Sequence, residues 1–251
     1  MAFAYFSRLG FLVKTTDLYF EPATMSAWQD FIKLYPQAAI INCLGAVPQK
    51  SGEANKLFWG NSIFALFLLN SLSPDNILIH PSTDCVFRGD KAPYASKEET
   101  DFYDYYSLSK GLAEKALVDR SNIQVIRTSI IGEDKSANAA GLLAWFLSHK
   151  DGDTVDGYVN HFWNGITTLE WCRQIHLLLN GWSYVPHSVL QLGTEEVYSK
   201  YEMLCLFNEL YRRRIIIKKT NAAKSVNRQL IPDIICPNLR RQLIEMIAFG
   251  L

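Results

Sequence analysis

The stretch from residue 77 to residue 110 constrains the fold of this chain more than any other. It opens with Ile-Leu-Ile at 77–79, a short apolar run that predicts a buried strand of a parallel sheet. The strand is expected to stop at Pro81, with the polar sequence Ser-Thr-Asp at 82–84 following its carboxyl end. In an open α/β sheet, ligands bind in the crevice outside these strand ends. The sequence therefore predicts a ligand site at this end of the strand.

Two residues further along have a spacing suited to catalysis. Tyr106 and Lys110 are four residues apart, so on a helix they lie on one face. A phenol has a pKa of about 10, and an ammonium group one turn away lowers that pKa because it stabilises the phenolate. With Thr83 holding the same oxygen by a hydrogen bond, Tyr106 can exchange a proton with a carbonyl or an alkoxide. This is the proton half of a hydride transfer, for which a nicotinamide would supply the hydride.

Each of these motifs also has an ordinary structural explanation. With twelve Tyr in 251 residues, roughly one Tyr-x-x-x-Lys pattern is expected by chance. Ser-Thr-Asp after a strand is a common turn or helix-entry cluster. The specificity lies in the combination of a strand, Ser-Thr-Asp-x-Val-Phe-x-Gly, a Pro-Tyr loop and Tyr-x-x-Ser-Lys at the start of a helix.

This combination resembles the extended short-chain dehydrogenase/reductases, in the branch of dTDP-4-dehydrorhamnose reductase and related sugar-nucleotide reductases. The resemblance covers most of the chain from about Pro22 onward and includes three later segments: Arg-Thr-Ser-Ile-Ile-Gly at 127–132, Gly-Leu-Leu-Ala-Trp-Phe-Leu at 141–147 and Trp-Asn-Gly-Ile-Thr-Thr-Leu at 163–169. It implies that Thr83, Tyr106 and Lys110 are the catalytic residues and that Asp84 is their neighbour in the active site.

The fold that the resemblance implies is α/β, a doubly wound, Rossmann-like parallel sheet with a small C-terminal α/β substrate domain. The predicted division is 1–150 for dinucleotide binding and 151–251 for substrate binding, with some strand exchange between the two. The chain pattern predicts helices at 4–9, 21–34, 51–72, 106–117, 142–148, 168–179, 200–212 and 238–247, and strands at 11–13, 38–41, 123–127, 189–192 and 215–217.

The start of the chain departs from the family pattern. A dinucleotide-binding fold opens with a strand and a glycine-rich turn that holds the pyrophosphate, yet Gly10 is the only glycine among the first forty residues. Gly10 fits the end of a first helix, so the first strand and the phosphate turn are expected to be absent. Two explanations stay open: a clipped or mis-assigned start, or loss of the usual cofactor-binding turn.

Cofactor contacts are predicted beside the ends of neighbouring strands. The resemblance assigns them to these residues: Asn42, Cys43, Leu44, Gly45, Asn61, Ser82, Lys110, Thr128 and Ser129. The glycine of the 42–45 turn lets a ligand approach the backbone, although a tight strand-to-helix turn needs it equally often. Asn61 is either a support of the active site or an isolated amide packed on a backbone carbonyl. The expected cofactor is NADP or NAD, with NADPH slightly preferred.

The resemblance also predicts substrate contacts, at Asp84, Val86, Trp163, Asn164 and Arg228. The aromatic segment around Trp163 and Asn164 suits a sugar or a base, and it suits an aromatic plug between domains equally well. Arg228 resembles the family's basic element near the nucleotide diphosphate, where it would pair with phosphate oxygens. A surface salt bridge is the alternative for Arg228.

Composition excludes several other classes of function. There are 25 basic and 25 acidic residues, so the net charge is zero and the pI is about 6.9, which predicts no nucleic-acid or membrane partner. The five cysteines show no Cys-x-x-Cys pairing and are expected to be reduced thiols in a cytoplasmic protein. The five histidines lack metal-ligand spacing, so no metal is expected. There is no signal-peptide pattern at the start.

The sequence therefore predicts NAD(P)H-dependent reduction of a keto group on a nucleotide-linked deoxysugar in surface polysaccharide synthesis. The expected partner is the nucleotide-sugar substrate, with a homodimer as a further expectation. Two alternatives stay open: an epimerase or dehydratase of the same family, which would hold NAD permanently, and a non-catalytic binding or regulatory protein on the same fold. The missing glycine turn favours the last, whereas the Thr-Tyr-Lys set favours catalysis.

Overall fold

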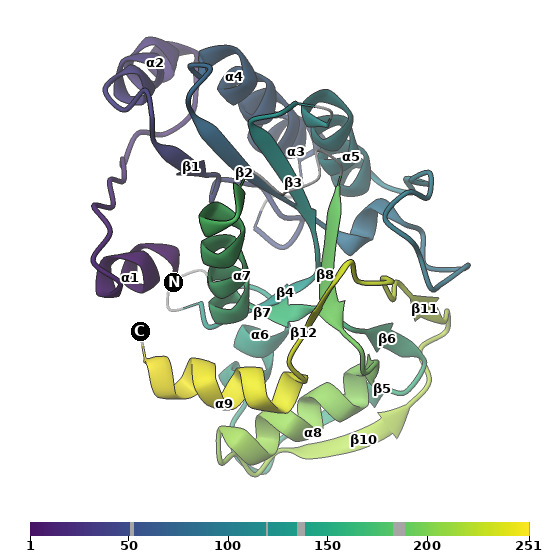
Figure 1. The fold of residues 1–251 in the computed structure, drawn as a ribbon. Coiled ribbons are helices and arrows are strands. Elements are labelled where there is room, and N and C mark those ends of the chain that lie inside the picture. The colour runs from purple at the N-terminus through teal and green to yellow at the C-terminus, as the bar shows by residue number, and fades with distance from the viewer. Residues whose placement is uncertain (51–52, 119, 135–138, 183–188, 251) are drawn as a thin grey trace.

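A parallel sheet forms the centre of the molecule (Figure 1). The computed structural model describes residues 1–50, 53–118, 120–134, 139–182 and 189–250. In these residues the central sheet has the order β1-β2-β3-β8-β12, with all neighbouring strands parallel. Its strands are β1 (Ala39–Ile41), β2 (Ile77–Ser82), β3 (Ile123–Arg127), β8 (Leu190–Thr194) and β12 (Ile234–Cys236). This sheet confirms the predicted α/β, Rossmann-like fold class.

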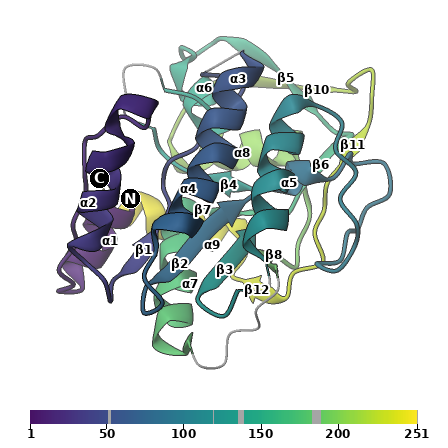
Figure 2. The same cartoon turned by 90° about the horizontal axis from the view of Figure 1, so that it is seen from above.

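Helices cover both faces of the central sheet, as Figure 2 shows from above. One face carries α2 (Met25–Lys33), α3 (Ala54–Phe58), α4 (Phe64–Ser71) and α5 (Tyr105–Leu117), and the other carries α1 (Ala2–Arg8) and α7 (Thr168–Asn180). Side chains alternate along a strand, so Leu78 of β2 packs toward α4 and α5 whereas Ile79 packs toward α7. Both side chains have an exposed fraction of 0%, which places β2 at the centre of the core.

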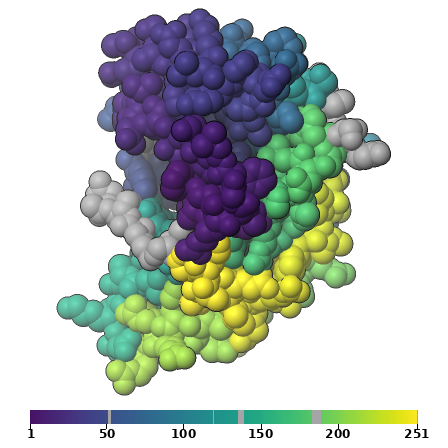
Figure 3. All heavy atoms as spheres, turned by 60° about the vertical axis from the view of Figure 1, so that its left-hand side comes forward, coloured from purple at the N-terminus to yellow at the C-terminus, as the bar shows by residue number. Residues whose placement is uncertain are grey.

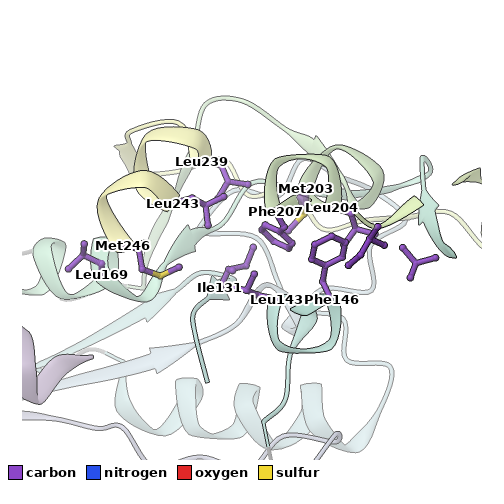
Figure 4. Close-up of a cluster of buried hydrophobic side chains, with 12 residues drawn as sticks. Ile131, Leu143, Phe146, Leu169, Met203, Leu204, Phe207, Leu239, Leu243 and Met246 are labelled. Atoms are coloured by element: carbon purple, nitrogen blue, oxygen red, sulfur yellow. The ribbon is translucent and has the colours of Figure 1, made fainter. Parts of the chain in front are cut away.

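The C-terminal part of the chain adds smaller sheets below the strand ends. β5 (Thr154–Tyr158) pairs with β10 (Ile216–Thr220), β4 (Ile130–Ile131) pairs with β7 (Ile166–Thr167), and β6 (His161–Trp163) lies between β9 (Tyr198–Ser199) and β11 (Val226–Asn227). Three helices close this part: α6 (Leu142–Ser148), α8 (Lys200–Leu210) and α9 (Leu239–Phe249). Figure 4 shows their buried side chains converging, among them Phe146, Phe207 and Leu243.

The two ends of the chain lie together on one surface of the molecule. In Figure 3 the purple N-terminal segment touches the yellow C-terminal helix. Arg8 at the end of α1 donates a hydrogen bond of 2.6 Å to the carbonyl oxygen of Phe249, and its guanidinium lies 4.0 Å from the centre of the Phe249 ring. This contact satisfies a carbonyl at the end of α9 that has no partner within the helix.

The central strands and most helices lie where the sequence predicts them, and three local predictions need correction. Residues 11–13 form no strand, and Phe11 and Leu12 are 48% and 83% exposed. A strand needs a hydrogen-bonding neighbour, and the described residues provide none there. The strand β2 does not stop at Pro81 but continues to Ser82. The predicted helix at 51–72 contains a π-helical turn at Trp59–Ile63 between α3 and α4, and its residues 51 and 52 lie outside the described ranges.

The division at residue 150 remains a prediction. β8, β12 and α7 come from the predicted second domain, yet they pack in and on the central sheet. Two further short helical turns complete the described chain, at Pro22–Thr24 before α2 and at Asp84–Val86 after β2. The second of these turns begins the candidate site.

Candidate active site

The carboxyl end of β2 presents Thr83 and Asp84 to the site. The chain leaves the strand at Ser82 and enters a 3-10 turn at Asp84–Val86. Thr83 is the N-cap of this turn, and its hydroxyl accepts a hydrogen bond of 3.1 Å from the backbone N–H of Cys85. The same hydroxyl lies 3.1 Å from Oδ1 of Asp84. The cap therefore fixes the orientation of Thr83, which is 7% exposed.

The helix α5 brings Tyr106 and Lys110 to the same strand end. It begins at Tyr105 because Asp104 caps it, accepting a 2.7 Å hydrogen bond from the N–H of Ser107 in a capping box. The hydroxyl of Tyr106, one position inside the helix, lies near enough to that of Thr83 for Thr83 to lower the Tyr106 pKa. Lys110, one turn further on, donates a 2.6 Å hydrogen bond from Nζ to the carbonyl oxygen of Pro81. The structure thus brings Thr83, Tyr106 and Lys110 together.

The electrostatics of Tyr106 differ from the prediction. Burial raises the pKa of Tyr106 above its ordinary value, and the charge of Cys85 adds to the rise, while the hydrogen bond from Thr83 lowers it. Burial also lowers the pKa of Lys110 to about 8, against the charge of Glu114. The Tyr106 pKa is therefore raised and not lowered as the spacing predicted, because burial removes water from around the phenol and Lys110 is not among the groups that act most strongly on it. Tyr106 is a protonated donor at neutral pH.

Asp84 lies between this group and a cation from the C-terminal part. Its carboxyl is buried, which raises its pKa, and the charge of Arg228 opposes that rise. Arg228 donates from Nε to the carbonyl oxygen of Phe87 at 2.9 Å and lies 3.8 Å from Sγ of Cys85. Its guanidinium also lies 4.8 Å from the centre of the Tyr103 ring. The predicted substrate residues Asp84 and Arg228 therefore occupy one side of the strand end.

The predicted cofactor turn follows β1, the neighbour of β2. Asn42 is buried; its Oδ1 accepts from the N–H of Leu44 at 2.9 Å, and its Nδ2 lies 3.1 Å from Nδ1 of His80. Cys43 and Gly45 are exposed and Leu44 is half-buried, so the turn offers its outer surface to a ligand. Because the Asn42 amide nitrogen donates, Nδ1 of His80 accepts and its Nε2 carries the proton.

Asn61 joins this turn to α5. Its amide accepts from the N–H of Ala46 at 2.9 Å and donates to the carbonyl oxygen of Ala46 and to Oγ of Ser109, both at 3.0 Å. Asn61 is 2% exposed, and its polar atoms are occupied by these contacts. This geometry gives Asn61 a positioning role: it fixes the turn after β1 against α5, where Tyr106 and Lys110 lie.

Two observations bear on how a cofactor would be held. Lys110 has three donors and uses one on Pro81, so two remain for ribose hydroxyls. The hydroxyl of Ser82 is buried and has no hydrogen-bond partner among the described residues. These groups fit the nicotinamide riboside half of NAD(P). Near the start of the chain, the described residues contain no glycine-rich turn. The structure therefore shows no backbone amides of that kind for the cofactor's pyrophosphate among these residues.

Three other predicted site residues, Thr128, Ser129 and Val86, make mainly local contacts. Thr128 is buried at the end of β3 and its hydroxyl is 3.3 Å from the carbonyl oxygen of Ser129, which accepts from the N–H of Ile166 at 2.9 Å. The side chain of Val86 is 0% exposed and packs with Phe87, so it offers a ligand no surface. The Thr128 hydroxyl and the Ile166 N–H therefore both donate to the Ser129 carbonyl oxygen.

Trp163 and Asn164 serve packing in this structure. The Trp163 ring packs against the apolar cluster shown in Figure 4. Asn164 is 3% exposed, and its amide donates to the carbonyl oxygens of Thr194 and Leu230 and accepts from the N–H of Leu230. Asn164 therefore holds the segment that carries Arg228, two residues before Leu230, in place. Its role as a direct substrate contact remains a prediction.

Three residues that interact with Arg228 were not predicted from the sequence. Cys85 and Tyr103 flank the guanidinium, and both stand next to residues of the recognised motifs, so proximity in sequence could have indicated them. Lys200 also interacts electrostatically with Arg228 and Cys85, and no local pattern predicted it.

Among the described residues, no group of three or more His, Cys, Asp or Glu side chains is placed to hold a metal ion. Within the same ranges, no helix has the length and apolar character to cross a bilayer.

A parallel sheet covered by helices on both faces defines a Rossmann-like fold, and Thr83, Tyr106 and Lys110 lie at one of its strand ends. Residues 71–155 match the family model of the RmlD substrate binding domain, and this match confirms the resemblance to the RmlD-like extended short-chain dehydrogenase/reductases. No curated protein sequence matches the chain.

Solved structures share the fold over most of their length. The dTDP-4-dehydrorhamnose reductase of Bacillus anthracis, in complex with NADP, has a TM-score of 0.74 at 16% identity and covers 96% of this chain and 94% of its own. The reductase of Yersinia enterocolitica has a TM-score of 0.74 at 14% identity, with 100% and 96% covered. The dTDP-glucose 4,6-dehydratase of Bacillus anthracis, in complex with NAD, has a TM-score of 0.69 at 15% identity, with 92% and 78% covered. At these identities the likeness establishes the fold.

Proposed function

We propose that this chain is an NAD(P)H-dependent reductase acting on a keto group of a nucleotide-linked deoxysugar, similar to dTDP-4-dehydrorhamnose reductase, in surface polysaccharide synthesis. The observation that carries the proposal is the grouping of three side chains at the end of β2: Tyr106 interacts with the Thr83 hydroxyl, and Lys110 donates to the carbonyl oxygen of Pro81, two residues before Thr83. The matched family segment contains all three residues, and several neighbours of the same fold are reductases of this kind.

Tyr106, Thr83 and Lys110 each have a separate role in the proposed proton transfer. A bound reduced nicotinamide would supply the hydride to the carbonyl carbon. Tyr106, protonated because burial raises its pKa, donates its phenolic proton to the carbonyl oxygen as that oxygen gains charge. Thr83 holds the same oxygen by its hydroxyl, which the Cys85 N–H keeps oriented. Lys110 stabilises the resulting phenolate and binds ribose hydroxyls, and solvent returns the proton to Tyr106.

Cofactor binding tests this proposal directly. Titration of the purified chain with NADPH and with NADH, followed by fluorescence, is expected to show saturable binding of at least one of them. Addition of dTDP-4-dehydrorhamnose is then expected to oxidise the bound cofactor. The Lys110→Met variant is the matched control, since it removes the ribose contact but leaves Tyr106 in place. Absence of binding by the wild-type chain would contradict the proposal.

The two alternatives give different outcomes in the same preparation. An epimerase or dehydratase retains its cofactor, so NAD released by denaturation of the purified chain would favour that reading over the reductase. Binding of a nucleotide sugar without cofactor oxidation would favour a non-catalytic binding protein. A homodimer is part of the proposal as well, and sedimentation equilibrium of the chain measures it.

A further inference from the structure

His80 of β2 links this strand to the turn that follows β1. The residue is 1% exposed, and its Nδ1 lies 3.1 Å from Nδ2 of Asn42. The other ring nitrogen, Nε2, is buried and has no hydrogen-bond partner among the described residues. Within the described ranges, Asn42 is therefore the one residue to which the imidazole is hydrogen-bonded.

The Asn42 amide in turn orders the start of the 42–45 turn. Its Oδ1 accepts from the N–H of Leu44 at 2.9 Å, which is the arrangement of an Asx turn. Just beyond the turn, Asn61 is hydrogen-bonded to the N–H and the carbonyl oxygen of Ala46. Residues 43–45 thus lie between two buried amides, each of which holds the backbone on one side.

The orientation of the Asn42 amide depends on what His80 presents to it. The amide nitrogen is a donor and the amide oxygen an acceptor, and a half-turn of the amide exchanges the two. In the structure, Nδ1 of His80 accepts from the nitrogen, and the N–H of Leu44 finds the oxygen. After the exchange, the amide nitrogen and the Leu44 N–H would be two donors facing each other. An imidazole without a proton on Nδ1 therefore selects the orientation that orders the turn.

Lys110 favours this form of the imidazole. Its ammonium donates at 2.6 Å to the carbonyl oxygen of Pro81, the residue next to His80. A proton on both ring nitrogens would put a second positive charge near that ammonium in a buried position. Burial and the charge of Lys110 both hold the pKa of His80 well below its ordinary value, so the imidazole is neutral at pH 7.

We propose that His80 is a positioning residue of the cofactor site: its unprotonated Nδ1 orients the Asn42 amide, and the amide holds the 42–45 turn in its binding shape before a cofactor arrives. A turn that is already ordered loses less conformational freedom on binding. This inference rests on the proposed function for the identity of the ligand, NAD(P)H. The role of His80 itself rests on the hydrogen bonds of the turn.

Two conservative variants separate this role from packing. In His80→Asn the side-chain oxygen can take the place of Nδ1, whereas in His80→Gln the amide reaches the place of Nε2. His80→Asn is expected to bind NADPH within about threefold of the wild-type dissociation constant, and His80→Gln about tenfold more weakly, since it loses one hydrogen bond. In both variants kcat at saturating NADPH is expected to change by less than about twofold. A packing role would give the opposite order of affinities, because glutamine fills more of the space of histidine.

Two measurements need no cofactor. Long-range proton–nitrogen NMR of the wild-type protein is expected to show a neutral His80 at pH 7 with its proton on Nε2. Hydrogen exchange of the Leu44 amide is expected to be about tenfold faster in His80→Gln than in the wild type or in His80→Asn.

Asn76→Leu is the matched control for both kinds of measurement. Asn76 is also a buried amide, 1% exposed, and it donates to the carbonyl oxygen of Ala38 at the opposite end of β1. Its replacement is expected to lower the stability but to leave the Leu44 exchange and the NADPH affinity unchanged.

Each outcome supports or overturns the inference. A proton on Nδ1 in the wild type, wild-type NADPH affinity in His80→Gln, or binding by His80→Asn as weak as that of His80→Gln would overturn it. Wild-type protein that binds neither NADPH nor NADH would overturn the proposed function. In that case the tautomer and the Leu44 exchange would still decide whether His80 orders the turn.

Discussion

The ammonium of Lys110 donates a hydrogen bond of 2.6 Å to the carbonyl oxygen of Pro81, two residues before Thr83. This contact joins the helix that carries Tyr106 to the strand that carries Thr83. Lys110 is 7% exposed, and burial lowers its pKa to about 8. A side chain that positions the site in this way also makes the site sensitive to pH.

The pH dependence of kcat/KM should reflect Lys110. Its lowered pKa means that the ammonium is present below about pH 8 and is lost as the pH rises through about 8. In the proposed mechanism the ammonium stabilises the phenolate of Tyr106, so kcat/KM for the reduction is expected to fall roughly tenfold per pH unit above about pH 8. A pH profile of the wild-type chain measures this. A rate that stays constant to about pH 10 would contradict the assignment.

Removal of the Thr83 hydroxyl should slow the reaction without loss of the cofactor. Thr83→Val keeps the shape of the side chain but removes the hydroxyl that lies near that of Tyr106, so kcat is expected to fall about 10²-fold. Thr83→Ser keeps the hydroxyl and serves as the control. The Cys85 N–H also loses its acceptor, which costs roughly 1 kcal/mol of stability and is checked by thermal unfolding. A Thr83→Val variant with wild-type kcat would exclude this role.

Arg127 and Glu114, which lies one helical turn after Lys110 on α5, form a buried ion pair. This pair should stabilise the fold only while both partners are present. Arg127 donates to both oxygens of Glu114, at 3.1 and 2.7 Å, and to Oε1 of Gln191 at 3.0 Å. The two side chains are 3% and 5% exposed, so Arg127→Met leaves a buried carboxylate and is expected to lower the free energy of unfolding by about 3–5 kcal/mol. Urea denaturation measures the change.

A matched pair on the surface provides the control for Arg127. Arg240 also contacts both oxygens of its partner Glu209, at 2.6 Å each, but the two side chains are 47% and 58% exposed. Arg240→Met should leave the stability nearly unchanged, because an exposed pair is solvated in either case. The double variant Glu114→Gln with Arg127→Met should be more stable than Arg127→Met alone. Equal destabilisation by the buried and exposed substitutions would contradict this account.

The sequence indicated the parts of the fold that depend on local patterns. Apolar β-branched runs marked β2 and β3, and the Tyr-x-x-Ser-Lys motif marked the start of α5. The motif spacing then placed Thr83, Tyr106 and Lys110 in one site. These features can be read locally because a strand end and one helical turn fix their relative positions.

Features that depend on tertiary contacts could not be predicted in this way. Residues 11–13 have the composition of a strand but no neighbour to pair with, and the two-residue strands β9 and β11 exist only because β6 lies between them. The raised pKa of Tyr106 follows from its burial among Thr83, Cys85 and Asp84. Lys200 acts electrostatically on Arg228 and Cys85 from a distant part of the chain, so no motif near Tyr106 could indicate it.

The most direct test of the central claim is the single-turnover rate of NADPH oxidation by dTDP-4-dehydrorhamnose in the wild-type chain and in Tyr106→Phe. Phenylalanine removes the proton donor and leaves the ring, so the rate is expected to fall by about 10²-fold to 10⁴-fold while the dissociation constant for NADPH changes by less than about twofold. A Tyr106→Phe variant that oxidises NADPH at the wild-type rate would contradict the account.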